Sequence, residues 1–123
     1  MTRNEILAPK SEFRNKLGRM RSHEWIDQRS LALHEAVARK LIERPELLDV
    51  ARQNLRRWLA QNPQPALMEW RRLFDTLDFD ELVDLLRCPD ERATRLRQSS
   101  PFAGVLTAQE RQAILDRYES QSA

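Results

Sequence analysis

Few side chains in this sequence are of the types that most often do chemistry, since its 123 residues include two histidines and one cysteine. A helix would place His23, Asp27 and His34 near one face, because steps of four and eleven residues both nearly complete whole turns. Zinc sites usually combine ligands at closer spacing, however, and Cys88 has no second cysteine beside it. We therefore expect no metal site and no cofactor.

A second candidate is the segment RSLALH, residues 29–34, in which a histidine stands five positions after an arginine. It resembles the R-x4-6-H signature of HEPN ribonucleases, which are also all-helical and of similar size. The resemblance implies that His34 assists proton transfer from a ribose 2′-hydroxyl while Arg29 stabilises the phosphate charge. On an unbroken helix five residues turn the two side chains about 140° apart, so they would converge only at a helix break or with a second chain. A ribonuclease toxin using Arg29 and His34 is the alternative function.

Arginines also stand beside tryptophans, in RRW at 56–58 and WRR at 70–72, a pairing suited to phosphate contact with base stacking. Both tryptophans fall on apolar helix stripes, so we interpret these arginines as solvated flanks. Several acidic residues between 75 and 84 would also repel a nucleic-acid backbone. The first 21 residues carry more basic than acidic side chains, and there the candidates for DNA contact are Arg14, Lys16, Arg19 and Arg21.

The segment SSPFAGVL, residues 99–106, has apolar side chains without a helical period. Ser100 precedes a proline and is pushed out of helical geometry, Pro101 has a fixed φ, and Gly104 permits a turn with positive φ. These residues predict a strap between two helices. Its apolar side chains either cover the chain's own core or dock in a groove of another protein. The candidate partner-binding residues are Phe102, Val105, Leu106, Arg95 and Arg97.

The elements that would position these residues are all helices, because apolar residues recur at helical intervals and no segment alternates as a strand does. A long helix is predicted from the N-cap Ser22 to a stop before Pro45. Its buried face comprises Ile26, Leu33, Val37 and Leu41.

Further helices are predicted over 45–61, 66–77, 78–88, 89–98 and 107–118. Asp78 with Glu81, and Thr107 with Glu110, are spaced as capping boxes, and Pro89 opens the helix over 89–98. We predict an all-α fold: a compact bundle of about five to six helices. A basic N-terminal arm at 1–21 precedes a single helical domain at 22–120, and residues 121–123 form a disordered tail.

The composition is that of a globular protein, with 41% hydrophobic and 33% charged residues. One domain suffices at this length. The N-terminus carries charge throughout and the apolar runs are too short to span a membrane, so we expect a cytoplasmic protein with no membrane contact. A single cysteine excludes an internal disulfide.

The segments WIDQRSLALHEAVARKL and RATRLRQSSPFAGVLTAQER lie between residues 25 and 111. With their SPFAG-type C-terminal segment they resemble a group of small bacterial proteins encoded beside toxin-like or nucleotidyltransferase-like genes. The resemblance implies an antitoxin-like or accessory role and carries over no catalytic residue. We therefore predict a protein-binding module that occludes a partner enzyme such as a toxin. DNA contact through the arm and self-association are open alternatives.

Overall fold

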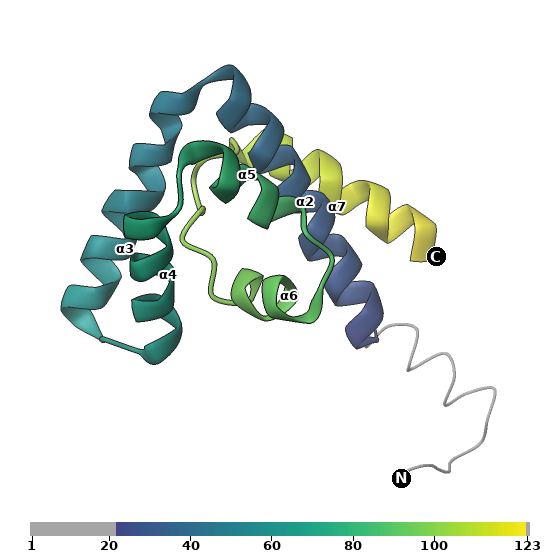
Figure 1. The fold of residues 1–123 in the computed structure, drawn as a ribbon. Coiled ribbons are helices and arrows are strands. Elements are labelled where there is room, and N and C mark those ends of the chain that lie inside the picture. Colours follow the sequence, from purple (N-terminus) through teal and green to yellow (C-terminus); the bar gives the residue numbers. More distant parts are fainter. Residues whose placement is uncertain (1–21, 123) are drawn as a thin grey trace, which may run out of the picture.

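The computed structural model describes residues 22–122, which contain helices and no strand. The all-α prediction is confirmed, with six α-helices and one short 3-10 helix over that range (Figure 1). In chain order they are α2 (His23–Glu43), η1 (Pro45–Leu47), α3 (Leu48–Gln61), α4 (Pro65–Thr76), α5 (Phe79–Arg87), α6 (Glu91–Arg97) and α7 (Ala108–Ser122).

Side-chain caps begin the helices where the sequence predicts them. Ser22 Oγ accepts the Trp25 amide at 3.0 Å and so caps α2. Both capping boxes form: in the box that begins α5, the Asp78 carboxylate accepts the Glu81 amide at 2.8 Å and Glu81 accepts the Asp78 amide at 2.9 Å. Thr107 and Glu110 make the same reciprocal pair before α7. Each pair satisfies two amides that have no partner inside the helix.

The start of α6 and the end of α7 differ from the prediction. Asp90, not Pro89, caps α6, because its carboxylate accepts the Ala93 amide at 2.8 Å. At the other end, α7 continues through Ser122, beyond the predicted end of that helix at residue 118. Neither glycine nor proline follows Glu119, so the sequence offers no residue that would stop the helix there.

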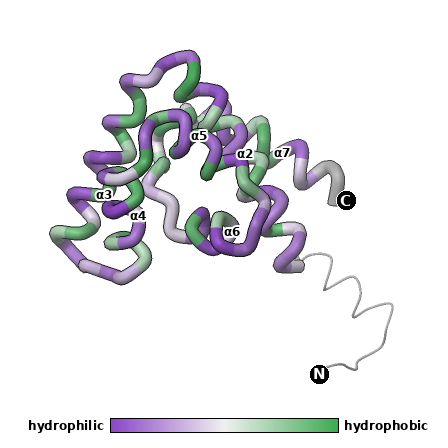
Figure 2. Tube along the Cα trace, viewed as in Figure 1, coloured by the Kyte–Doolittle hydropathy of each residue, from purple (hydrophilic) through white to green (hydrophobic). Residues whose placement is uncertain are grey.

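The core lies where α2, α3, α4, α5 and α6 meet, and Figure 2 shows apolar positions of these helices alternating with polar ones. Trp70 of α4 is fully buried, and its indole Nε1 donates to the Leu96 carbonyl at 2.9 Å. Phe74 and Phe102 complete an aromatic cluster, with ring centroids 5.7–6.2 Å apart. Such edge and offset contacts stabilise the core beyond the area that they bury.

The predicted buried face of α2 is confirmed only in part. Val37 and Leu41 are buried and Leu33 is half-buried, but Ile26 is 39% exposed. The spacing of the apolar residues predicts which residues share a face, whereas it does not predict how far along the helix its neighbours reach. Ile26 lies in the first turn of α2, beyond the part that the core covers.

The strap, residues 99–106, runs between α6 and α7 and packs on the chain's own core. Phe102 and Val105 are 3% and 2% exposed, and Gly104 has a φ of +94°, as the turn prediction requires. The amide of Asn54, on α3, donates to the Pro101 carbonyl at 3.0 Å and to the Ala103 carbonyl at 2.8 Å. Of the two alternatives for the strap, the structure therefore shows self-packing. No helix between residues 22 and 122 is long and apolar enough to cross a bilayer.

Candidate functional site

A concavity with an apolar floor and charged walls lies between α3 and α4. The two helices are consecutive, and a three-residue connection with Pro63 returns the chain so that they pack side by side (Figure 1). Pro65, at the first position of α4, has the φ that a helix start requires. The α3–α4 groove has a volume of about 510 Å³ and is lined by Arg52, Leu55, Arg56, Leu59, Ala60, Arg71, Phe74 and Asp75.

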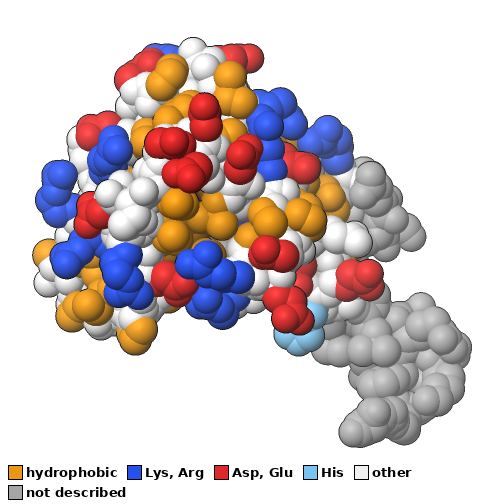
Figure 3. Space-filling model, viewed as in Figure 1, with side chains coloured by type: hydrophobic (Ala, Val, Ile, Leu, Met, Phe, Trp, Pro, Cys, Tyr) orange, Lys and Arg blue, Asp and Glu red, His pale blue; other side chains and the backbone are white. Residues whose placement is uncertain are grey.

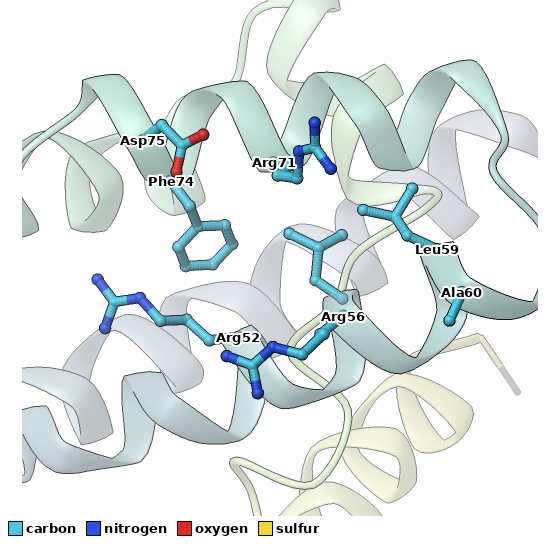
Figure 4. A pocket seen from close by; sticks show the side chains of 8 residues that line it. Arg52, Arg56, Leu59, Ala60, Arg71, Phe74 and Asp75 are labelled. Atoms are coloured by element: carbon cyan, nitrogen blue, oxygen red, sulfur yellow. The ribbon is translucent and has the colours of Figure 1, made fainter.

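The floor of the α3–α4 groove is apolar and its sides are basic. Figure 4 shows the Phe74 ring of α4 between the two helices, with Arg52 and Arg56 projecting from α3 and Leu59 towards the far end. The Arg52 guanidinium lies 5.8 Å from the centre of the Phe74 ring, where the ring face attracts a cation. Arg71 stands on the α4 side. The groove thus presents arginines around apolar and aromatic side chains. Arginine and aromatic residues contribute much of the binding energy in many protein interfaces.

Within the described range, the three arginines of the groove have no carboxylate partner, in contrast to Lys40, Arg92 and Arg95 elsewhere on the surface. Lys40 pairs with Glu110 at 2.6 Å, and both Arg92 and Arg95 pair with Glu69 at 3.2–3.3 Å. Among the residues that the structure describes, Arg52, Arg56 and Arg71 make no ion pair. Figure 3 shows several basic side chains over α3 and α4 with acidic ones among them, and a group of acidic side chains nearer α5.

A second, smaller cavity of about 190 Å³ lies where the strap meets α2, and His34 and Ser100 both line it. His34 Nε2 is 2.8 Å from Ser100 Oγ, and Nδ1 is 2.7 Å from the Ser30 carbonyl. The pKa of His34 is lowered from 6.5 to about 4, chiefly because burial penalises the charged ring; the bond to Ser30 opposes this shift and the positive charge of Arg97 adds to it. The ring is therefore neutral at pH 7.

The structure corrects the partner-binding assignment made from the sequence. Phe102 and Val105 belong to the core, and Arg97 is 5% exposed, donating to the Cys88 carbonyl at 2.7 Å near the end of α5. These three side chains offer no free surface, because their contacts within the chain already bury them. Leu106 is half-buried beside the smaller cavity, and Arg95 is exposed but paired with Glu69.

The pair required for a ribonuclease is not assembled within one chain. Arg29 and His34 lie on α2, which is unbroken from His23 to Glu43. The Arg29 guanidinium stacks 5.0 Å from the Trp25 ring, whereas both ring nitrogens of His34 are occupied by Ser30 and Ser100. The two side chains thus have separate surroundings.

The candidates for DNA contact, Arg14, Lys16, Arg19 and Arg21, lie outside the described residues. Within the described part of the chain, no three His, Cys, Asp or Glu side chains gather in a way that could hold a metal ion.

The sequence reasoning missed both sites. For the groove a signal existed, since RRW and WRR place arginines beside the apolar stripes of two consecutive helices. For the pair of His34 and Ser100 no signal existed, because 66 positions separate the two residues.

No family model, no curated protein and no solved structure matches this chain. Its described residues define a helical bundle of all-α class. What the chain does is therefore inferred from its own surface, of which the α3–α4 groove is the most distinctive part.

Proposed function

We propose that the protein is a binding module that holds an acidic, amphipathic helix of a partner protein in the α3–α4 groove. The observation that carries this proposal is the set of unpaired arginines, Arg52, Arg56 and Arg71, around an apolar floor. A partner helix with leucines on one stripe and glutamates on its flanks would satisfy both features. Its carboxylates would pair with guanidiniums, which suit bidentate contact.

The length of the groove indicates how much of a partner it can hold. From Arg52 to Ala60 the α3 wall spans eight residue steps, which at about 1.5 Å per residue is roughly 12 Å. That distance matches about two turns of a helix, so the occupant would place two or three apolar anchors on the floor. Phe74 and Leu59 are partly buried and would lose their remaining exposed area to those anchors.

Charge also favours one orientation of the occupant. Asp75 lies beside Phe74 at one end of the groove, and Leu59 and Ala60 lie at the other end (Figure 4). The acidic residues of α5 begin just beyond Asp75, at Asp78 and Asp80. A partner that is acidic along its length and basic at the Asp75 end would meet opposite charge throughout. Like-charge contact would penalise the reverse orientation.

In biological terms we propose an antitoxin-like inhibitor or accessory subunit. Covering the acidic helix of a partner enzyme would occlude the surface to which that helix belongs, without any covalent chemistry. The basic residues Arg14, Lys16, Arg19 and Arg21 would add an electrostatic contact to DNA. We expect the affinity for a DNA duplex to fall by orders of magnitude between 50 and 200 mM salt, and to be lost when these four are replaced by alanine.

The groove can be tested by fluorescence anisotropy of the full chain with fluorescein-labelled helical peptides. One peptide carries leucine at positions i, i+3, i+4 and i+7 with glutamate elsewhere, and its counterpart carries lysine in place of glutamate. A single-stranded RNA of similar length is the third probe. We expect the acidic peptide to bind and to weaken with salt.

Matched variants assign that binding to the groove. The double variant Arg56→Glu, Arg71→Glu should raise the Kd by at least about tenfold, because it reverses two of the charges that face the peptide. The control Arg39→Glu, Arg117→Glu changes the net charge equally at exposed positions of α2 and α7 and should leave the Kd within about twofold. Equal loss in both variants, or preferential binding of the lysine peptide or the RNA, would contradict the proposal.

A further inference from the structure

The hydrogen bonds of His34 leave it only one arrangement of protons. A carbonyl oxygen only accepts, so His34 Nδ1, 2.7 Å from the Ser30 carbonyl, must carry the hydrogen. Because the ring is neutral at pH 7, Nε2 then carries a lone pair. Ser100 Oγ, 2.8 Å away, must donate its proton to that lone pair. Ser100, His34 and the Ser30 carbonyl therefore stand as nucleophile, base and orienting group.

This arrangement faces a cavity instead of being sealed in the core. Ser100 and His34 both line the space of about 190 Å³ beneath the strap, and Ser100 is half-buried. Leu33, Val37 and Leu106 form apolar walls of this cavity, and Arg111 of α7 also lines it. Drug-sized pockets measure roughly 300–1,000 Å³, so this one suits a short acyl chain.

We propose that Ser100 and His34 form an acyl-transfer pair that attacks small, short-chain esters in this cavity. Ser100 Oγ bonds to the carbonyl carbon while its proton passes to His34 Nε2. The tetrahedral intermediate then expels the alcohol, which takes that proton, and the acyl group remains on Oγ. Water next attacks the acyl-serine and gives a proton to Nε2. The carboxylic acid leaves as Oγ regains its proton, so ester and water become acid and alcohol.

The surroundings of the pair support the charged stages of this reaction. The Phe102 amide donates to Ser100 Oγ over 3.3 Å and so helps to fix the position of that hydroxyl. The Ser30 carbonyl accepts from Nδ1 and so stabilises the imidazolium that forms. Two charged groups lie near His34 on packed elements: Arg97 of α6, whose positive charge disfavours that imidazolium, and Arg111 of α7, which lines the same cavity. We therefore expect slow turnover and choose activated substrates.

The test uses the full chain with a biotinylated ethoxyfluorophosphonate, which forms a stable adduct on an activated serine with loss of fluoride. Peptide mapping should locate the adduct on Ser100. Ser99 is the matched control, because it lies in the same strap and its hydroxyl contacts only the Leu96 carbonyl, at 3.4 Å. Ser99→Ala should react as the unchanged protein does, and Ser100→Ala should lose at least about 100-fold in labelling rate.

A second measurement needs no variant of the buried histidine. p-Nitrophenyl butyrate should give a stoichiometric burst of p-nitrophenol, and its rate should be flat from pH 8 to pH 5 and fall as pH approaches 4, where His34 gains its proton. The absence of a Ser100 adduct in the folded protein, or an adduct without any release of p-nitrophenol, would overturn the proposal. The groove variant Arg56→Glu, Arg71→Glu should retain both the fluorophosphonate labelling and the release of p-nitrophenol. The proposal for this cavity and the proposal for the groove are therefore tested independently.

Discussion

The buried His34 makes the stability of the protein fall in mild acid. Its pKa is lowered from 6.5 in the unfolded chain to about 4 in the folded one, chiefly because burial penalises the charged ring. As the pH drops below 6.5, His34 becomes protonated in the unfolded chain, whereas in the folded chain it stays neutral until about pH 4. Protonation in this window therefore favours unfolding.

The magnitude follows from the size of the shift. Each pKa unit corresponds to about 1.4 kcal/mol, so a shift from 6.5 to about 4 corresponds to about 3 kcal/mol once both states are protonated. At pH 5 the unfolded state is almost fully protonated and the folded state is not, which leaves a loss of about 2 kcal/mol relative to pH 8. That loss is a substantial fraction of the stability of a small domain.

Urea unfolding at pH 8, 7, 6 and 5, followed by tryptophan fluorescence, measures this dependence. His34→Gln removes the titrating ring, so the variant should be less stable at pH 8 but should lose far less of its stability between pH 7 and pH 5. His23→Gln, at an exposed position of the same helix, is the control and should follow the unchanged protein. A parallel pH dependence in the protein and in His34→Gln would refute the assignment to this ring.

Three further substitutions test the strap and the core by urea unfolding. Asn54→Ala should cost about 2–3 kcal/mol, because two strap carbonyls lose their donor, whereas Gln53→Ala on the exposed face should cost little. Gly104→Ala should cost about 1–2 kcal/mol through its φ of +94° alone, since an added Cβ would meet its nearest neighbour at an ordinary 3.6 Å. Trp70→Phe should cost at least about 1–2 kcal/mol, because the Leu96 carbonyl loses its indole donor. Unchanged midpoints would contradict each expectation.

The helices and their caps could be predicted because their causes are local. The N-cap at Ser22 and the capping boxes at Asp78 and Thr107 involve residues three positions apart, so the sequence displays both partners together. The turn at Gly104 is local for the same reason. The prediction that Pro89 opens α6 was wrong because the neighbouring Asp90 supplies the side-chain cap. This error is confined to adjacent residues of one segment.

The sites could not be predicted because distant segments build them. Arg97 looks like a surface cation in sequence, and only the fold brings the end of α5 to its guanidinium. Likewise, the apolar residues of the strap carry no sign of which surface they cover. The α3–α4 groove could be predicted in part. The sequence shows its arginines and leucines on two consecutive helices, but whether they line one groove depends on how those helices pack.

The strap joins parts of the chain that are made long before it. Its residues bond to His34 on α2 and Asn54 on α3, and its Phe102 ring covers Trp70 on α4. During synthesis all of the helices from α2 to α6 would emerge from the ribosome while the indole still lacked that cover. A chain that stops short of residue 106 would keep its helical segments but expose an aromatic surface, making it a target for proteases and chaperones. The strap thus decides whether the helices made before it keep their packing.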